Sequence, residues 1–384
     1  AGLELDWQPF ALLAGTFTAR SLTVSEIDVL HAPPPTATEE DSGGESFELP
    51  LAVSIDRFGV RALKVDESVA GVGAVLGIDG EASAREDGVG SFRLEAHRRD
   101  GAKGDLSAEA VYALETRRLD LKLSLNEPAG GLLAGLLDIP GRPPVSATLN
   151  GTGSLDGWRG WFSGSAGDSL QADARIELAL ADKLSVKADG SANIAQALPD
   201  SLRRLAGPDM QFAADLSWDD KTRELGINLA SLSSEAGIAE GSGTLNLESS
   251  ALDGRVSASL TDSAMIGTFA PPVEFALADA DATVRGRLND GLDVTGTVQA
   301  SSVALSDTRL NGLTGENPRL DISARISPDG TTDISSAVLH AAAGTISLSG
   351  LVGTGAVTAD LAGSAEIPDL TALKGLLQAP VLGK

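Results

Sequence analysis

A pattern of period two dominates the chain, with apolar residues at one parity and charged or hydroxyl residues at the other. In residues 119–125 a leucine stands at every odd position, with Asp, Lys and Ser between them. Residues 172–180 repeat the pattern with Ala, Ile and Leu. Successive side chains of a β-strand point to opposite faces, so each such stretch predicts a strand with one apolar and one wet face. On the order of two dozen such strands follow one another along the chain.

Asp-Gly dipeptides separate several of these stretches, and they favour the tight turns of β-hairpins. Residues 87–88, 290–291 and 329–330 stand between predicted strands. The same dipeptide at 79–80 and 189–190 is also compatible with a position inside a strand. Short turns of this kind predict antiparallel pairing between strands that are consecutive in the sequence.

Short Leu-rich segments that begin with proline interrupt the strands at residues 128–137, 199–205 and 368–377, and more weakly at 7–14. Proline is tolerated in the first turn of a helix, where its missing N–H has no partner in any case. These segments therefore predict short helices. Residues 32–44 combine three prolines with acidic and small residues, which predicts a disordered surface loop.

The predicted fold is all-β: one long, twisted antiparallel sheet that curls into an elongated groove (a β-taco), with a few short Pro-initiated helices. We expect residues 1–384 to form one continuous body and to be a segment of a longer protein. Many positions on the apolar parity are Ala or Gly, which leaves space along that face. The alternative is a collapsed core of two packed sheets.

A long apolar groove suits a hydrocarbon chain, because burial contributes about 0.8 kcal/mol per CH₂ wherever the chain lies. A charged head group would stay in water at the open seam, since its burial without a partner is costly. Two dozen strands spaced by about 4.8 Å would extend roughly 100 Å. The residues predicted to line this groove are Leu119, Leu121, Leu123, Leu125, Ile176, Leu178, Leu180, Leu225, Ile227, Leu229, Val256, Leu260, Val284, Leu288, Val294, Val298, Ile322, Ile326, Ile346 and Leu348.

Charge narrows the possible partners. The chain has 54 Asp and Glu against 29 Lys and Arg, a formal net charge of -25, which would repel nucleic acids and anionic lipid surfaces. It contains no cysteine, so disulfides and thiolate chemistry are excluded. The longest uncharged apolar run, residues 69–78, is well short of the roughly 20 residues of a membrane-spanning helix.

Residues with catalytic potential are few. His31, His97 and His340 lie far apart in the sequence, and none has a metal-ligating neighbour at a suitable spacing. No G-x-S-x-G motif is present. Trp158 and Trp161 could form a platform for sugar stacking, or they could anchor the end of a strand at the lip of the groove. We predict no catalytic residues, no metal site and no cofactor.

Acidic and glycine-rich stretches give no stronger signal. The acidic residues in 39–41, 219–220 and 279–281 lack the spacing of a calcium loop and are typical of turns and solvated faces. The glycines in 71–77 and 151–157 lack both the G-x-G-x-x-G spacing and a Walker lysine. Turns and strand glycines explain them better than phosphate binding does.

Two stretches carry a family resemblance. Residues 3–15 (LELDWQPFALLAG), followed by 22–24 and 27–30 before a Pro-rich gap, and residues 125–137 (LNEPAGGLLAGLL) resemble the TamB family, the translocation and assembly module subunits of AsmA-like type. The repeated strand pattern extends the likeness to residue 384. These are similarities of strand and helix pattern, and they include no catalytic motif.

The resemblance implies a non-enzymatic conduit for phospholipid between the inner and outer membranes of a Gram-negative envelope, with acyl chains in a β-groove. It further implies a contribution to outer-membrane biogenesis and to autotransporter assembly. The protein would lie in the periplasm, with an inner-membrane anchor helix that this chain lacks. A TamA-like outer-membrane partner would bind outside this segment. The alternatives are a structural or adhesive β-solenoid of the cell envelope and a carbohydrate-active enzyme.

Overall fold

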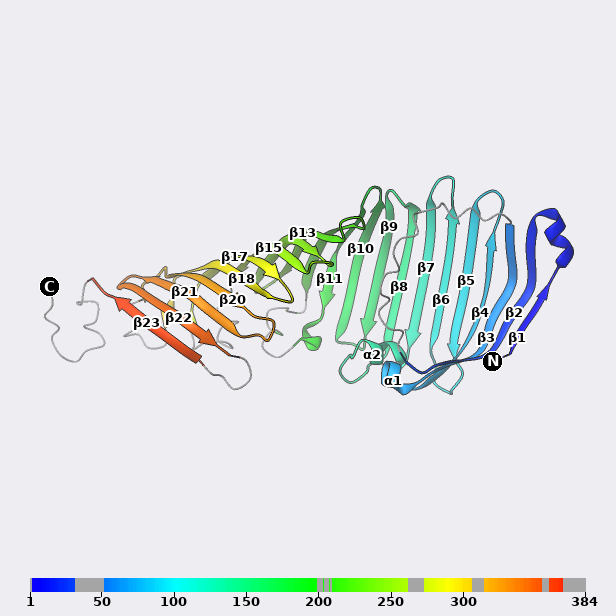
Figure 1. The fold of residues 1–384 in the computed structure, drawn as a ribbon. Helices are drawn as coiled ribbons and strands as arrows, with labels where there is room; N and C mark the ends of the chain where they lie inside the picture. Colours follow the sequence, from blue (N-terminus) through cyan, green and yellow to red (C-terminus); the bar gives the residue numbers. More distant parts are fainter. Residues whose placement is uncertain are drawn as a thin grey trace. The chain divides into compact units, whose positions relative to one another are not determined.

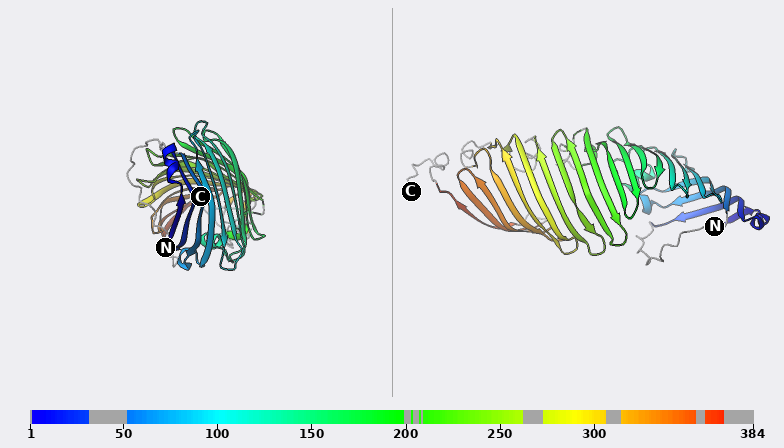
Figure 2. Two further views of the ribbon diagram at one scale, coloured as in Figure 1. Left: turned by 90° about the vertical axis from the view of Figure 1, so that its right-hand side faces the viewer. Right: turned by 90° about the horizontal axis from the view of Figure 1, so that it is seen from above.

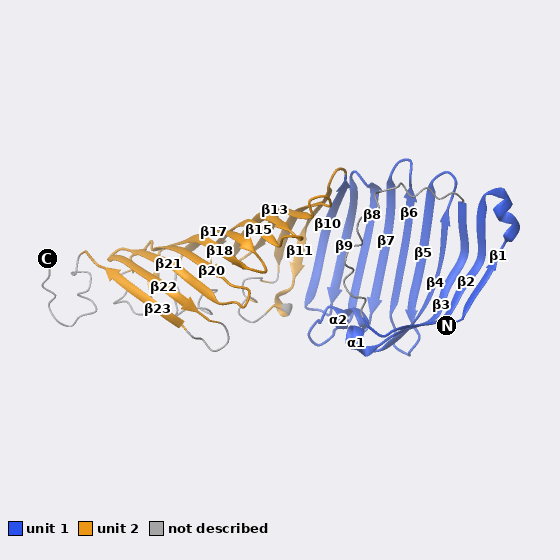
Figure 3. Ribbon diagram, in the orientation of Figure 1, with its two compact units in different colours: residues 1–180 blue, residues 181–384 orange. Residues whose placement is uncertain are grey.

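The prediction of an all-β, mostly antiparallel open sheet is confirmed by the structure, a computed structural model (Figure 1). The chain divides into two compact units, residues 1–180 and 181–384, which are described separately (Figure 3). The structure describes residues 2–31, 52–198, 203, 207, 209–261, 273–305, 314–353 and 359–368.

Unit 1 is a sheet in which each strand pairs with its neighbours in the sequence. Its strands are β1 (Leu3–Trp7), β2 (Thr16–Val29), β3 (Ala52–Val65), β4 (Ala74–Ala84), β5 (Val89–Arg98), β6 (Asp105–Ala113), β7 (Arg118–Glu127), β8 (Val145–Ser154), β9 (Trp158–Ala166) and β10 (Leu170–Leu180).

Within unit 1 the described pairs are antiparallel except β2 with β3, which run parallel from Thr16 opposite Ala52 to Val29 opposite Val65. A parallel pair requires a connection that returns to the same end of the sheet. The predicted loop at 32–44 belongs to this connection and lies outside the described residues.

Unit 2 repeats the meander, as the second view of Figure 2 shows. Its main sheet follows the order β11 (Leu184–Asn193), β12 (Met210–Asp219), β13 (Glu224–Ser234), β14 (Gly237–Asn246), β15 (Ala251–Leu260), β17 (Leu277–Arg287), β18 (Gly291–Ser301), β20 (Arg319–Ile326), β21 (Thr332–Ala341), β22 (Gly344–Val352) and β23 (Ala359–Glu366). A separate short pair joins β16 (Val273–Glu274) to β19 (Ala304–Leu305).

The Asp-Gly dipeptides have two different roles. Gly88 (φ 75°) and Gly330 (φ 82°) occupy hairpin turns, in a left-handed conformation that glycine adopts without strain. Gly88 N–H donates to the Arg85 carbonyl at 3.0 Å, which closes the turn between β4 and β5. Gly80 and Gly190 lie inside β4 and β11, so those two dipeptides mark no turn.

The helices are short. In unit 1 they are η1 (Pro9–Ala14), α1 (Glu67–Ala70) and α2 (Leu132–Leu136); η2 (Ala195–Ala197) belongs to unit 2. Helix η1 begins with proline, as expected, whereas α2 starts after Gly131 and occupies only the second half of the predicted 128–137 segment. The predicted helix at 368–377 lies outside the described residues except for its first position, and of 199–205 only residue 203 is described.

Helices α1 and α2 pack together at the edge of unit 1 where strands end, although they follow β3 and β7 respectively (Figure 1). Their approach needs Gly135, because a Cβ at this position would overlap the Ala70 carbonyl. Arg142 donates from Nη1 to the Gly71 carbonyl at 2.6 Å and fixes the same contact. Ala134 of α2 packs against Val145 and Ala166 of the sheet in a small buried cluster.

Candidate functional site

In unit 1 the apolar residues form one continuous face, here called the apolar face. Residues directly opposite each other in a strand pair share a face of the sheet. Leu121 lies opposite Ala110 on β6 and Gly151 on β8, and Gly151 leads through Gly160 on β9 to Ile176 on β10. The aligned residues stay mainly apolar across β2 and β3 and on to β1. The face therefore reaches from the first to the last strand of the unit.

The main sheet of unit 2 has an equivalent apolar face. Ala282 on β17 lies opposite Val256 on β15 and Gly296 on β18. Gly296 lies opposite Ile322 on β20, which in turn lies opposite Ala337 on β21. Alanine and glycine are frequent on this face, so few long side chains project from it and its surface has low relief.

Most of the predicted lining residues lie on these two faces by their strand register. In unit 1 they are Leu119, Leu121, Leu123, Leu125, Ile176 and Leu178. In unit 2 they are Leu225, Ile227, Val256, Leu260, Val284, Val294, Val298, Ile322, Ile326, Ile346 and Leu348.

Leu229 does not share the apolar face, because a β-bulge in β13 shifts the register. Asn228 and Leu229 together oppose Ser242, and Leu229 is aligned with Asp215. The extra residue of a bulge reverses the parity of the residues after it, which a strict alternation does not foresee. Leu180 ends β10 and Leu288 follows β17, beyond the aligned pairs of those strands.

Among the residues that the structure describes, no second layer fills the space over the predicted lining residues. None of them is buried. Several are largely exposed, among them Val256 at 48% and Leu348 at 44%. The buried hydrophobic residues of the described chain are mostly alanines, and no large side chain there is fully buried. A packed two-sheet core would bury its Leu, Ile and Val side chains almost completely. As far as the described residues go, the apolar face is thus left uncovered.

The opposite face, here called the polar face, carries cross-strand ion pairs. Arg93 on β5 bridges Glu81 on β4 at 3.5 Å and Glu109 on β6 at 2.8 Å. Arg159 pairs with Glu177 between β9 and β10 at 3.1 Å. Exposed pairs of this kind contribute little stability each. Because these charged residues lie on the polar face, that side of the sheet is solvated, whereas the other side is apolar.

Hydrogen bonds on the polar face keep several carboxylates ionised. The Thr152 hydroxyl and then the Arg118 guanidinium lower the pKa of Asp120. The Asn228 amide, followed by a lysine, lowers the pKa of Asp215. A donor to the charged form of a carboxyl always acts in this direction. These two carboxylates therefore stay ionised to lower pH than an unperturbed Asp.

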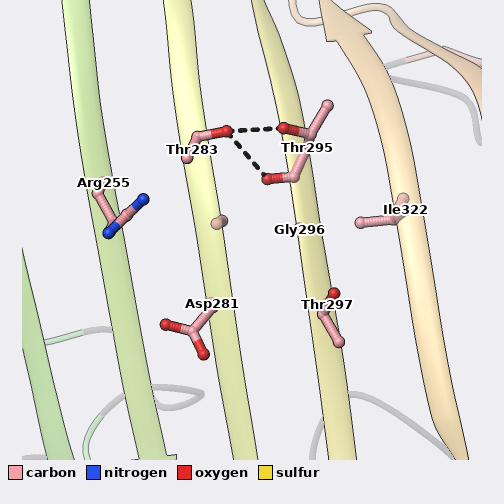
Figure 4. Close-up of a pocket in the computed structure, with 8 residues that line it drawn as sticks. Arg255, Asp281, Thr283, Thr295, Gly296, Thr297 and Ile322 are labelled. Carbon is pink, nitrogen blue, oxygen red and sulfur yellow. Dashed lines mark hydrogen bonds between the residues drawn. The ribbon is translucent and has the colours of Figure 1, made fainter.

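One shallow depression of about 460 Å³ lies on the polar face of unit 2, between β15 and β20 (Figure 4). Thr283 and Thr295 face each other across it, with their hydroxyl oxygens 2.6 Å apart. Thr297 donates to Asp321 at 2.8 Å. These hydroxyls are engaged with neighbouring strands, so they form no converging set of free donors; the Arg255 guanidinium also lines the depression.

The candidates for chemistry remain dispersed. Among the described residues no cluster of three or more His, Asp or Glu side chains could hold a metal ion. Asp219 accepts backbone N–H donors from Lys221 and Thr222, which is a turn-stabilising role. Trp158 is aligned with Leu178 on the apolar face, whereas Trp161, three residues later, points to the polar face and is 54% exposed. The two indoles therefore cannot form one sugar-stacking platform.

Three features escaped the sequence analysis. Helix α1 is signalled by Asp66, whose carboxylate accepts the Ser68 N–H at 2.9 Å in an N-cap. Arg98 and Asp100 form an ion pair at the end of β5, with side chains that are 7% and 22% exposed. Trp158 is buried at 5% exposure, and its signal is the run of glycines in the strands beneath it.

No family model, curated protein or solved structure matches the chain. Within the part of the chain that the structure describes, no helix has both the length and the apolar character needed to span a membrane.

Proposed function

We propose that this protein is a non-enzymatic lipid carrier that holds phospholipid acyl chains against its apolar face and serves as a conduit for them. One observation carries the proposal: most of the predicted lining residues form continuous faces in each unit, and none of the predicted set is buried. Soluble proteins seldom leave large contiguous apolar surfaces without a ligand or partner.

Acyl chains suit this surface better than a compact ligand does. The apolar face has low relief and no converging polar groups, so it offers no preferred position for a small polar molecule. Methylene groups gain about 0.8 kcal/mol each on leaving water, at any point along such a face. A zwitterionic or charged head group would stay at the strand ends, where polar side chains and water are available.

The resemblance to the TamB family adds the cellular context to the proposal. On this basis the protein lies in the periplasm and is attached to the inner membrane. It carries phospholipid between the inner and outer membranes, supports autotransporter assembly and cooperates with a TamA-like outer-membrane protein. Location and partner rest on the sequence resemblance alone.

Site-specific photo-crosslinking tests the proposal through the parity of one strand. A photo-reactive amino acid at Leu121 or Ile176, on the apolar face, should capture phospholipid in cells. The same group at the neighbouring Lys122 or Glu177, on the polar face, should not. Equal labelling at both parities would show that the sheet does not hold lipid on one face, and the proposal would then be wrong.

The alternative of an adhesive β-solenoid finds no support in the pairing. A β-helix is built from parallel rungs. The described strand pairs of both units are antiparallel apart from β2 with β3.

A further inference from the structure

One polar group on the apolar face of unit 1 has no partner. The indole nitrogen of Trp158, Nε1, is the buried side-chain donor that lacks a hydrogen bond among the residues that the structure describes. A buried indole N–H normally finds an acceptor, because its desolvation is otherwise uncompensated. Such a group in a native structure therefore calls for an explanation.

The surroundings of Trp158 hold the indole in place. Gly151 on β8 and Gly160 on β9 lie directly opposite each other, and a Cβ on either would overlap the six-membered ring of Trp158. The ring therefore lies against a floor of bare backbone. Leu178 lies directly opposite Trp158 on β10. Glycines in register thus create a seat for one aromatic side chain.

Trp158 also lies at a boundary between apolar and polar surroundings. It is the first residue of β9 and directly follows the hairpin turn. At this end of the strands Arg117 donates to Asp156 at 2.7 Å and to the Leu180 carbonyl at 2.9 Å. The apolar face continues from Trp158 in the other direction, through Gly160 and Ile176. A donor at such a boundary suits an amphipathic ligand whose acceptor lies between head and tail.

We propose that the Trp158 N–H is a specificity-determining donor for the ester carbonyl of an acyl lipid. An ester carbonyl lies between the head group and the hydrocarbon, which matches the position of Trp158 between the polar strand ends and the apolar face. Indole is a donor only, so the ligand must supply an acceptor. The Nε1 atom is shielded from water in the structure, so a ligand acceptor would have to displace the groups that cover it. This inference rests on the proposed function.

A matched pair of lipids tests it. Binding to the purified protein is measured for a phosphatidylcholine with two oleoyl ester chains and for its analogue with two ether-linked oleyl chains. The zwitterionic head group avoids repulsion by the net charge of -25. Ether oxygens are weaker acceptors, so the wild-type protein should prefer the ester lipid by up to about tenfold, the value of one net hydrogen bond.

Trp158→Phe keeps an aromatic ring in the glycine seat and removes the donor. It should bind the two lipids equally, with its affinity for the ether lipid close to that of the wild type. Trp161→Phe is the matched control, because Trp161 lies on the same strand but is exposed on the polar face. It should keep the preference. Circular dichroism and thermal unfolding of each variant show that the sheet is intact.

The outcomes separate the two proposals. A wild-type protein that binds both lipids without preference, or a Trp158→Phe variant that keeps the preference, overturns the role of Trp158 and leaves the proposed function standing. A wild-type protein that binds neither lipid overturns the proposed function and this inference with it. A preference that Trp158→Phe removes and Trp161→Phe retains supports both.

Discussion

Single glycines determine what the apolar face can accommodate. Gly151 and Gly160 have no left-handed backbone requirement, so the reason for glycine there is the space taken by the Trp158 ring. A larger residue would have to displace the indole from its seat, and overpacking of this kind typically costs about 1–3 kcal/mol. The absence of a side chain at these positions is thus itself a packing feature.

We expect Gly151→Val to destabilise unit 1 by about 1–3 kcal/mol, because the new side chain and the Trp158 ring compete for one volume. The urea midpoint, followed by circular dichroism, measures the change. Gly157→Ala is the control: it lies in the turn next to β9, has nothing within 4 Å of its added Cβ, and should stay within about 0.5 kcal/mol of the wild type. Equal effects of the two substitutions would contradict the packing argument.

At the scale of single strands, parity alone predicted most of what the structure shows. In a strand with one apolar and one solvated face, alternation decides on which face each side chain lies. Residues such as Leu121 and Val294 could therefore be assigned to a face from the sequence. Leu229 could not, because a bulge depends on backbone hydrogen bonding that alternation does not encode. Helix α1 was missed because its few residues form no periodic pattern, and its cap signal is short.

The ion pairing of side chains at strand ends also could not be predicted from the sequence. Arg98 donates to Asp100 at 2.6 and 3.0 Å and to the Gly73 carbonyl at 3.4 Å. Asp100 also accepts the Val75 N–H at 3.2 Å. This ion pair therefore ties the end of β5 to the start of β4. The chain offers many other Arg and Asp residues, and only the fold selects this pair for burial.

The pH dependence of stability tests this element. The Arg98 guanidinium, assisted by backbone N–H donors, lowers the pKa of Asp100 to about 2 from 3.8. Because the folded pKa is the lower one, the contribution of this carboxylate is complete above about pH 4 and is lost as the pH falls through 2. We expect Asp100→Asn to lower the free energy of unfolding by about 1–2 kcal/mol at pH 7 and by much less at pH 2.

Asp87→Asn is the control for that experiment, because the Asp87 carboxylate pairs with Arg85 at an exposed turn. Its effect should stay within about 0.5 kcal/mol at both pH values. Urea unfolding between pH 2 and pH 7 measures all three proteins. A loss from Asp100→Asn that is the same at pH 2 and pH 7 would show that the ion pair is not its cause.

For the molecule as a whole, the division into two faces reconciles a strongly acidic surface with a large open apolar area. The acids and hydroxyls on the polar face keep the protein soluble, since a net charge of -25 opposes self-association. The apolar face would otherwise be a liability for aggregation. A lipid bound as proposed would remove that liability, and the ligand would then have a structural as well as a functional role.

A charge placed on the apolar face of either unit should therefore impair lipid carriage. Val294 is half-buried on β18, opposite Val284 and Ala324. Val294→Arg puts a cation where acyl chains would lie, and its desolvation would oppose their binding. We expect purified Val294→Arg to retain much less phospholipid by mass spectrometry and cells carrying it to lose outer-membrane integrity. Val294→Ile preserves the apolar surface and should match the wild type. Full lipid content in Val294→Arg would contradict the role of this face, because the substitution changes no residue of the polar face and leaves the strand pairing available.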